Sequence, residues 1–264
     1  MNGPQRIACL TTETVEVLYL LGEEDRIAGI SGFTVRPARA RKEKPKISGF
    51  SSAQIDRILA VNPDLVLAFS DMQADMVRDL IKHGLEVHVF NQRNIAGILE
   101  MIRVVGALVD AADKAAALIA KLQSTIDEVK TRAASLPRRP RVYFEEWNEP
   151  MISGIRWASE LIEMAGGDDI FPELSLAPNA AGRFITDPME VVRRAPDIII
   201  GSWCGRKFQP DAVATRPGWD AIPAVKNGDL VEMKSAVILT PGPVAISEGL
   251  PELAGIIRGW AEKA

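Results

Sequence analysis

The chain has 264 residues, of which 47% are hydrophobic and 25% are charged, and its formal net charge is -4. The hydrophobic content suffices for one large domain or two of ordinary size, while the slight acidity gives no general attraction to nucleic acid or anionic membranes. The two cysteines, Cys9 and Cys204, form neither a CxxC site nor a disulfide framework. No apolar run approaches the roughly 20 residues of a membrane helix.

The first part of the chain alternates strand-like and helix-like segments. Ile7–Leu10 is predicted as a short buried strand, and a hydroxyl-rich turn separates it from a helix, Val15–Leu21, that ends at Gly22. Ile27–Ile30 is predicted as the second strand, and a long loop, Ser31–Ser52, follows it. Long loops in compact folds are often functional. The next predicted elements are the helices Ala53–Val61 and Met72–His83 and the strands Asp64–Phe69 and Glu86–Phe90.

Residues 110–136 are predicted to form one long helix. Asp110 is a suitable N-cap, and neither Gly nor Pro follows until Pro137. Apolar residues recur at four-three spacing and form one narrow stripe: Ala115, Ile119, Leu122, Ile126 and Val129. Roughly 25 residues at ~1.5 Å each span nearly 40 Å, which is long for a connector within one domain. We interpret this helix as a spacer between two units, with an ordinary packing helix as the alternative.

The segments on the two sides of this helix repeat each other in order. The matched pairs are Arg141–Phe144 with Arg6–Cys9, Pro196–Ile200 with Pro63–Leu67, and Asn227–Met233 with His83–Val89. Strands that alternate with helices predict mostly parallel sheets covered on both faces. We therefore predict an α/β fold of two doubly wound, Rossmann-like lobes, 1–109 and 137–264, joined by the helix 110–136. Ligands of such sheets bind beyond the carboxyl ends of the strands, so the loops there should line a cleft between the lobes.

This order of elements resembles the class III substrate-binding proteins of ABC importers. The resemblance runs from Arg6 to Trp260 and rests on Thr11–Thr14, Ile27–Ser31, the two Pro-Asp strands and Leu161–Ile170. That family binds vitamin B12 and other corrinoids, ferric siderophores, haem and some metal ions. The corrinoid branch looks nearest, because Ile47–Phe50 places an aromatic residue where that branch often has one facing the ligand. The resemblance implies a protein that clamps cobalamin, another corrinoid or a metal chelate and presents it to an ABC permease.

The resemblance also implies one acidic docking residue in each lobe, early in the helix before Pro-Asp. Asp56 occupies that place in the first lobe, seven residues before Pro63. In the second lobe the matching position is Met189, and Glu190 lies one residue off. Docking to a permease is therefore expected through Asp56 and Glu190, with a relative that binds the ligand but serves no importer as the alternative.

The predicted ligand-binding residues are those placed after strands or in the long first loop: Thr11, Thr12, Phe33, Phe50, Trp147, Arg183, Trp203 and Thr240. Trp147 follows the first strand of the second lobe, and Trp203 follows the second Pro-Asp strand, so both indoles are candidates for a flat contact. Packing inside the lobe is the alternative for each. The hydroxyls of Thr11 and Thr12 either hold a polar ligand group or cap the following helix.

Catalysis is not predicted. The chain contains no G-x-S-x-G, P-loop or G-x-G-x-x-G opening a helix, and His83 and His88 have no second ligand at metal spacing. Glu145, Glu146 and Glu149 could form an acid–base pair, but nothing in the sequence positions them. The expected partner is a small molecule, with no resident cofactor or metal and a monomeric chain. A cytoplasmic sensor or enzyme on the same scaffold is the alternative function.

The location is open at this level. The first residues, from Met1, lack the apolar core of an export signal. The sequence therefore predicts a periplasmic protein if a leader has been trimmed, and a cytoplasmic one if Met1 is the native start.

Overall fold

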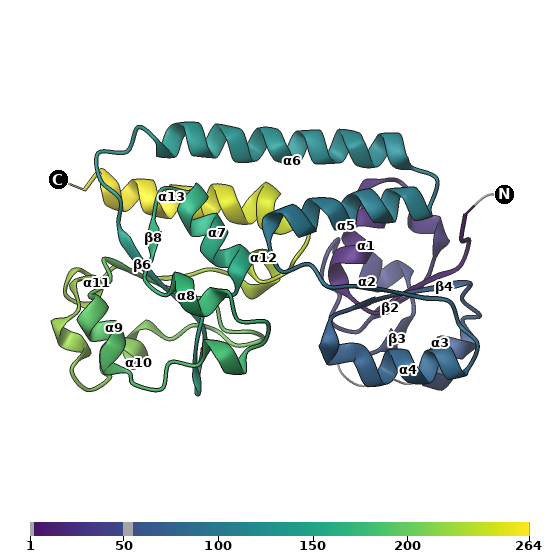
Figure 1. Ribbon diagram of the computed structural model, residues 1–264, viewed down its shortest axis with the longest axis horizontal. Coiled ribbons are helices and arrows are strands. Elements are labelled where there is room, and N and C mark those ends of the chain that lie inside the picture. The colour runs from purple at the N-terminus through teal and green to yellow at the C-terminus, as the bar shows by residue number, and fades with distance from the viewer. Residues whose placement is uncertain (1–2, 50–54, 264) are drawn as a thin grey trace. The chain divides into compact units, whose positions relative to one another are not determined.

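The computed structural model describes residues 3–49 and 55–263 and consists of two compact α/β units (Figure 1). The first unit contains residues up to Gln92 together with Ala96–Lys121, and the second contains Arg93–Ile95 and Leu122–Ala264. None of the helices in the described part of the chain is both long enough and apolar enough to cross a membrane.

The first unit is built on a five-stranded parallel sheet in the order β3-β2-β1-β4-β5. Its strands are β1 (Ile7–Cys9), β2 (Ile27–Ser31), β3 (Lys46–Ser48), β4 (Leu65–Phe69) and β5 (Val87–Phe90). Its helices are α1 (Thr12–Leu20), α2 (Ala40–Glu43), α3 (Ile55–Ala60), α4 (Ala74–Lys82) and α5 (Ile95–Leu108). The central strands are apolar at every position because helices cover both faces of the sheet, as the sequence predicts.

The second unit has a mixed sheet in the order β10-β9-β6-β7, with β8 paired to the start of β6. Its strands are β6 (Arg141–Asn148), β7 (Met151–Ser153), β8 (Asp168–Asp169), β9 (Ile198–Gly201) and β10 (Leu230–Glu232). Its helices are α7 (Arg156–Met164), α8 (Pro172–Ser175), α9 (Met189–Arg194), α10 (Pro210–Ala214), α11 (Pro223–Asn227), α12 (Ser235–Ile238) and α13 (Leu250–Ala261). The antiparallel hairpin β6–β7 has no counterpart in the sequence prediction, which ended the strand at Phe144.

Two aspartates show the internal repeat at atomic level. The Asp64 carboxylate accepts the backbone N–H of Arg6 at 2.9 Å, and the Asp197 carboxylate accepts the backbone N–H of Arg141 at 2.9 Å. In each unit the aspartate therefore holds the start of the central strand beside the strand that follows the Pro-Asp pair in the chain. This is the physical reason for the repeated Pro-Asp motif.

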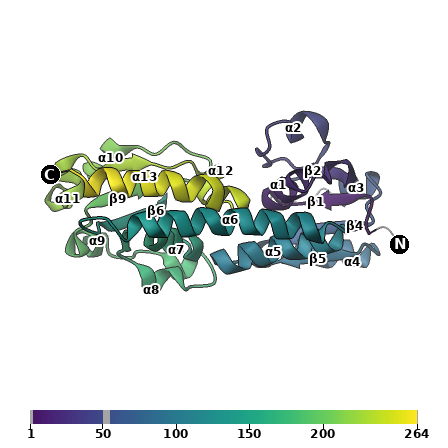
Figure 2. The same cartoon turned by 90° about the horizontal axis from the view of Figure 1, so that it is seen from above.

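Helix α6 (Ala112–Ala133) is the long helix predicted from the sequence, shortened by two residues at its start and three at its end. Its turns up to Lys121 group with the first unit and those from Leu122 with the second, so it is not a separate segment between two lobes. The predicted stripe is largely correct, because Ala115, Leu122, Ile126 and Val129 are buried. Within the second unit the helix runs beside α13 in both views (Figures 1 and 2).

Candidate functional site

In the second unit, the parallel strands β6 and β9 end at the same edge of the sheet, and β6 continues beyond it into the hairpin with β7. Polar and aromatic side chains follow one another at this end of β6. The last residues of β6 are Glu145, Glu146, Trp147 and Asn148. The loop after β9 is tied to this strand by the hydrogen bond from the Ser202 N–H to the Glu145 carbonyl, 2.9 Å long.

A hollow of about 570 Å³ lies along this hairpin. It is open to solvent and is bordered by the hairpin turn, by the segment leading into α9 and by the segment between α10 and Trp219. Its lining is Asn148, Glu149, Pro150, Met151, Phe184, Ile185, Thr186, Pro188, Met189, Arg216, Pro217 and Trp219. Phe184 and Met189 are 38% and 41% exposed, so the hollow presents two large apolar side chains to solvent. A mostly apolar hollow of this volume with few polar groups is typical of small-molecule sites.

Arg216, which lines the hollow, is held from within the unit by an ion pair with Glu145. Glu145 is fully buried and receives two hydrogen bonds from the guanidinium of Arg216, at 2.5 and 3.0 Å. The Trp203 indole N–H and the Tyr143 hydroxyl also donate to this carboxylate, each at 3.0 Å. The Arg216 guanidinium lies 4.5 Å from the centre of the Trp219 ring. Burial, followed by the charge of Glu145, raises the pKa of Tyr143 well above its usual value, so its hydroxyl remains a donor.

A second ion pair lies on the neighbouring residue of β6. Arg183 is buried, donates to both oxygens of Glu146 at 2.5 and 2.9 Å, and also donates to the Ser153 carbonyl at 2.6 Å. The sequence prediction that Arg183 reaches a ligand is wrong for this conformation, because its guanidinium is used inside the unit. The next residue, Phe184, is the one that reaches the hollow.

The two predicted tryptophans differ in their surroundings. Trp203 is 3% exposed and belongs to the core of the second unit, where its ring meets Phe208 edge-on at 5.2 Å. The packing alternative therefore describes Trp203, and the predicted ligand contact is wrong for this conformation. Trp147 is half-buried against the same core, and its indole N–H donates to the Glu149 carbonyl at 2.8 Å. The guanidinium of Arg206 lies over the Trp147 ring, 5.6 Å from its centre.

In the first unit, α1 begins directly after β1. Thr11 is fully buried, and its hydroxyl lies 3.2 Å from that of Thr14, while Thr12 is only half-buried. Glu13, in the first turn, is 3% exposed, and its Oε1 has no hydrogen-bond partner. Burial, and to a smaller degree the nearby charge of Glu16, raises the pKa of Glu13 to about 7.

The long first loop places Phe33 on the surface, 63% exposed, immediately after β2. Phe50, the other predicted aromatic of this loop, lies outside the described residues. The basic residues of the loop are held by their own unit: Arg39 contacts Glu24 and the Tyr19 ring, and Arg41 donates to the Thr34 carbonyl at 2.8 Å. This basic run is therefore a structured surface rather than a free cationic arm.

The remaining predicted residues have local partners or lie on the surface. The Thr240 hydroxyl donates to the Ala236 carbonyl at 3.1 Å and so completes the end of α12. Asp56 is exposed in the first turn of α3. Glu190, in the first turn of α9, is bound by Arg193 and Arg194 at 2.6 and 2.8 Å, so its charge is compensated within its own helix.

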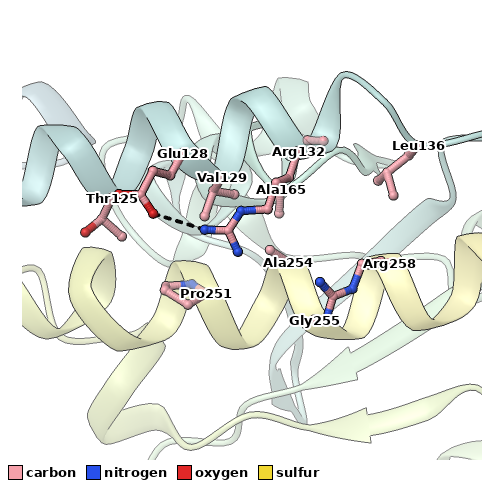
Figure 3. Close-up of a pocket in the computed structure, with 11 residues that line it drawn as sticks. Thr125, Glu128, Val129, Arg132, Leu136, Ala165, Pro251, Ala254, Gly255 and Arg258 are labelled. Atoms are coloured by element: carbon pink, nitrogen blue, oxygen red, sulfur yellow. Dashed lines mark hydrogen bonds and ion pairs between the residues drawn. The ribbon is translucent and has the colours of Figure 1, made fainter.

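Another hollow in the second unit lies between α6 and α13 (Figure 3). Its volume is about 160 Å³, and it is lined by small side chains such as Ala254 and by Arg132, which is paired with Glu128 at 3.0 Å. Ligand pockets usually measure roughly 300–1,000 Å³. The hollow beside the β6–β7 hairpin is therefore the better candidate in this unit.

Comparison with known proteins gives a consistent result. A family model described as periplasmic binding protein matches residues 7–237. The vitamin B12-binding protein of Vibrio campbellii is 24% identical over 205 residues, which cover 76% of this chain and 72% of that protein. An uncharacterized ABC transporter substrate-binding lipoprotein of Bacillus subtilis is 24% identical over 257 residues, covering 95% of this chain and 79% of its own length.

Solved structures share the fold along the whole chain. The periplasmic heme-binding protein of Roseiflexus sp. RS-1 superposes with a TM-score of 0.84 at 18% identity, covering 98% of this chain and all of that one. The periplasmic vitamin B12 binding protein of Vibrio cholerae gives a TM-score of 0.78 at 18% identity and covers 99% of both chains. At this level of identity, the superpositions establish the two-unit α/β fold.

Proposed function

Because the chain belongs to the periplasmic binding protein family, we propose that it is the substrate-binding protein of an ABC-type importer and that its ligand is a corrinoid. The observation that carries the proposal is the hollow beside the β6–β7 hairpin, with Phe184 exposed in it and Arg216 compensated by Glu145. A corrinoid has a large ring framework and many neutral carboxamide groups, which suit an apolar wall with few charges. Relatives named as vitamin B12-binding proteins support the same ligand class.

The chemistry at the edge favours binding over catalysis. The family consists of binding proteins, and two of the three carboxylates that an acid–base mechanism would use, Glu145 and Glu146, are each held by an arginine. The guanidinium N–H groups occupy oxygens of both carboxylates, so neither carboxylate is free to contact a substrate. We therefore propose a protein that binds and releases its ligand unchanged.

The proposal extends to a partner and a place of action. The family and the lipoprotein relative point to work outside the cytoplasm, with an ABC permease receiving the ligand. Asp56 is the better candidate for permease contact, because Glu190 is already compensated by Arg193 and Arg194. Fractionation of the source cells tests the location, and loss of labelled corrinoid uptake after gene deletion tests the role in import.

Binding is tested directly by titration. The protein has five tryptophans, so quenching of their fluorescence by cyanocobalamin, dicyanocobinamide, haem and a ferric siderophore can be compared in one assay. We expect saturable binding of the two corrinoids at lower concentration than the siderophore. Saturable binding of the ferric siderophore with no response to either corrinoid would overturn the ligand assignment.

A further inference from the structure

Arg216 supplies the positive charge in the lining of the hollow beside the β6–β7 hairpin, and Glu149 is the lining's other charged residue. The Arg216 side chain keeps 18% exposure, while its partner Glu145 has none. A cation facing an apolar pocket normally attracts carboxylates, since charge-assisted hydrogen bonds are the strong ones. Here the buried carboxylate of Glu145 already neutralises the charge of Arg216.

The ion pair of Arg216 with Glu145 has no net charge, but some N–H groups of its guanidinium remain available as hydrogen-bond donors. A guanidinium has five N–H groups, and the two bonds to Glu145 use one on each terminal nitrogen. The remaining N–H groups can serve a neutral acceptor such as a carboxamide carbonyl. A ligand carboxylate would meet a neutralised pair, with the Glu145 carboxylate and Glu149 both close, and would still have to shed its water.

We propose that Glu145 is a specificity-determining positioning residue: by neutralising Arg216 it makes the hollow accept carboxamide side chains of a macrocyclic ligand and reject carboxylates. The inference rests on the proposed function for the choice of a macrocycle. Glu145 touches no ligand itself, because it is fully buried. It acts through the charge and the orientation of Arg216.

Glu145→Gln separates this role from a structural one. The glutamine has nearly the same shape: its amide carbonyl can still accept from the Trp203 indole, and its NH2 group can donate to the Tyr143 hydroxyl, which lies at the other oxygen position. It no longer compensates the charge of Arg216. The double variant Glu145→Gln/Arg216→Gln removes the charge again. Glu232→Gln is the matched control, since this carboxylate of the same sheet accepts the Phe208 N–H and pairs with no guanidinium among the described residues.

The probes are two matched pairs. Dicyanocobinamide and dicyanocobyrinic acid share a corrin ring but carry carboxamides and carboxylates, respectively. Haem and haem dimethyl ester share a porphyrin but differ in having carboxylates or esters. Dissociation constants are measured by absorbance titration for all four probes with the parent protein and each variant. The ratio within a pair cancels general damage to the fold.

For each probe pair that the parent protein binds, we expect the neutral probe to bind more tightly than the carboxylate probe. Glu145→Gln should shift that ratio toward the carboxylate member by roughly tenfold, as expected for one uncovered charged hydrogen bond. The double variant should restore the parent ratio, and Glu232→Gln should leave it unchanged.

The outcomes separate the two claims. An unchanged ratio in Glu145→Gln, with the corrin bound, overturns the role of Glu145 while the proposed function stands. Binding of the porphyrins alone, with the predicted shift, overturns the corrinoid assignment and supports the role of Glu145. Binding of none of the four probes overturns both.

Discussion

Arg183 and Phe184 are neighbours in the chain with opposite environments. Arg183 is buried and bidentate to Glu146, whereas the ring of Phe184 is 38% exposed and lines the hollow beside the β6–β7 hairpin. The backbone here forms a bridge between Ile152 and Phe184, which fixes which of the two side chains turns inward. One residue therefore serves stability and the next is placed to serve binding.

Phe184→Ala should weaken ligand binding with little effect on folding. A central aromatic contact is typically worth about 2 kcal/mol or more, which corresponds to a loss of more than tenfold in affinity. Because the ring is partly exposed, we expect the melting temperature to change little. Titration and thermal melting of the same variant test this, with Phe184→Leu as a control that keeps an apolar side chain. An unchanged affinity in Phe184→Ala would remove this ring from the site.

Arg183→Gln should destabilise the second unit. Removing one partner of a buried ion pair leaves the other charge uncompensated, which typically costs about 3–5 kcal/mol. The lower end applies here, because Glu146 retains some exposure to water. Denaturant unfolding should show the loss, and the double variant Arg183→Gln/Glu146→Gln should recover part of it. Full stability in the single variant would show that the pair contributes nothing.

The fold could be predicted because its strongest signals are local and repeated. The pairs Pro63-Asp64 and Pro196-Asp197 each precede an apolar strand, and each aspartate binds the neighbouring central strand in the structure. The long helix was predicted from its stripe and its lack of Gly and Pro. The family inferred from this order of elements is confirmed by the family model. The hairpin β6–β7 was missed because Glu145–Asn148 reads as a polar loop.

The site was predicted less well, because side-chain direction depends on contacts distant in sequence. Trp203 follows a strand as a ligand contact should, but Glu145, 58 residues earlier, draws its indole inward. The same carboxylate binds Arg216, 71 residues later, and no local pattern marks that pair. The signal for this buried pair in the sequence is Glu145 itself, a glutamate that directly follows an apolar strand. The sequence predicts Arg183 as a ligand contact, whereas its neighbour Phe184 lines the hollow. The two differ because the arginine side chain turns into the unit.

Glu13 should make stability depend on pH. Its pKa is raised to about 7 in the folded state, chiefly by burial, so the folded state favours the protonated carboxyl. The free energy of unfolding should therefore fall as pH rises from the unfolded-state pKa, near 4.5, to about 7, by up to about 3 kcal/mol. Glu13→Gln should flatten this dependence and be more stable than the parent at pH 8. The exposed Asp25→Asn is the control. Equal pH profiles for parent and Glu13→Gln would contradict the assignment.

Gly201→Ala should disrupt the end of β9. A Cβ at this position would lie 1.8 Å from a carbon of the Phe208 ring, so this buried ring would have to shift within the core. Overpacking of this kind typically costs about 1–3 kcal/mol or more. Denaturant unfolding should show the loss, and Gly201→Ala/Phe208→Leu should recover part of it. Gly255→Ala, in the interior of α13, is the control: a Cβ there meets nothing within 4 Å, so this variant should lose no stability and should gain some helix propensity.

Trp147→Ala should lower both the melting temperature and the ligand affinity. The indole packs against the core of the second unit and donates to the Glu149 carbonyl at 2.8 Å, so its removal leaves a gap and an unpaired turn. Trp147 directly precedes Asn148 and Glu149, which line the hollow, so we expect affinity to fall more than tenfold, as for a central aromatic anchor. Trp147→Phe should keep most of the packing but lose the hydrogen bond. If Trp147→Ala lowers the melting temperature and leaves the dissociation constant unchanged, the residue packs within its unit and does not contact the ligand.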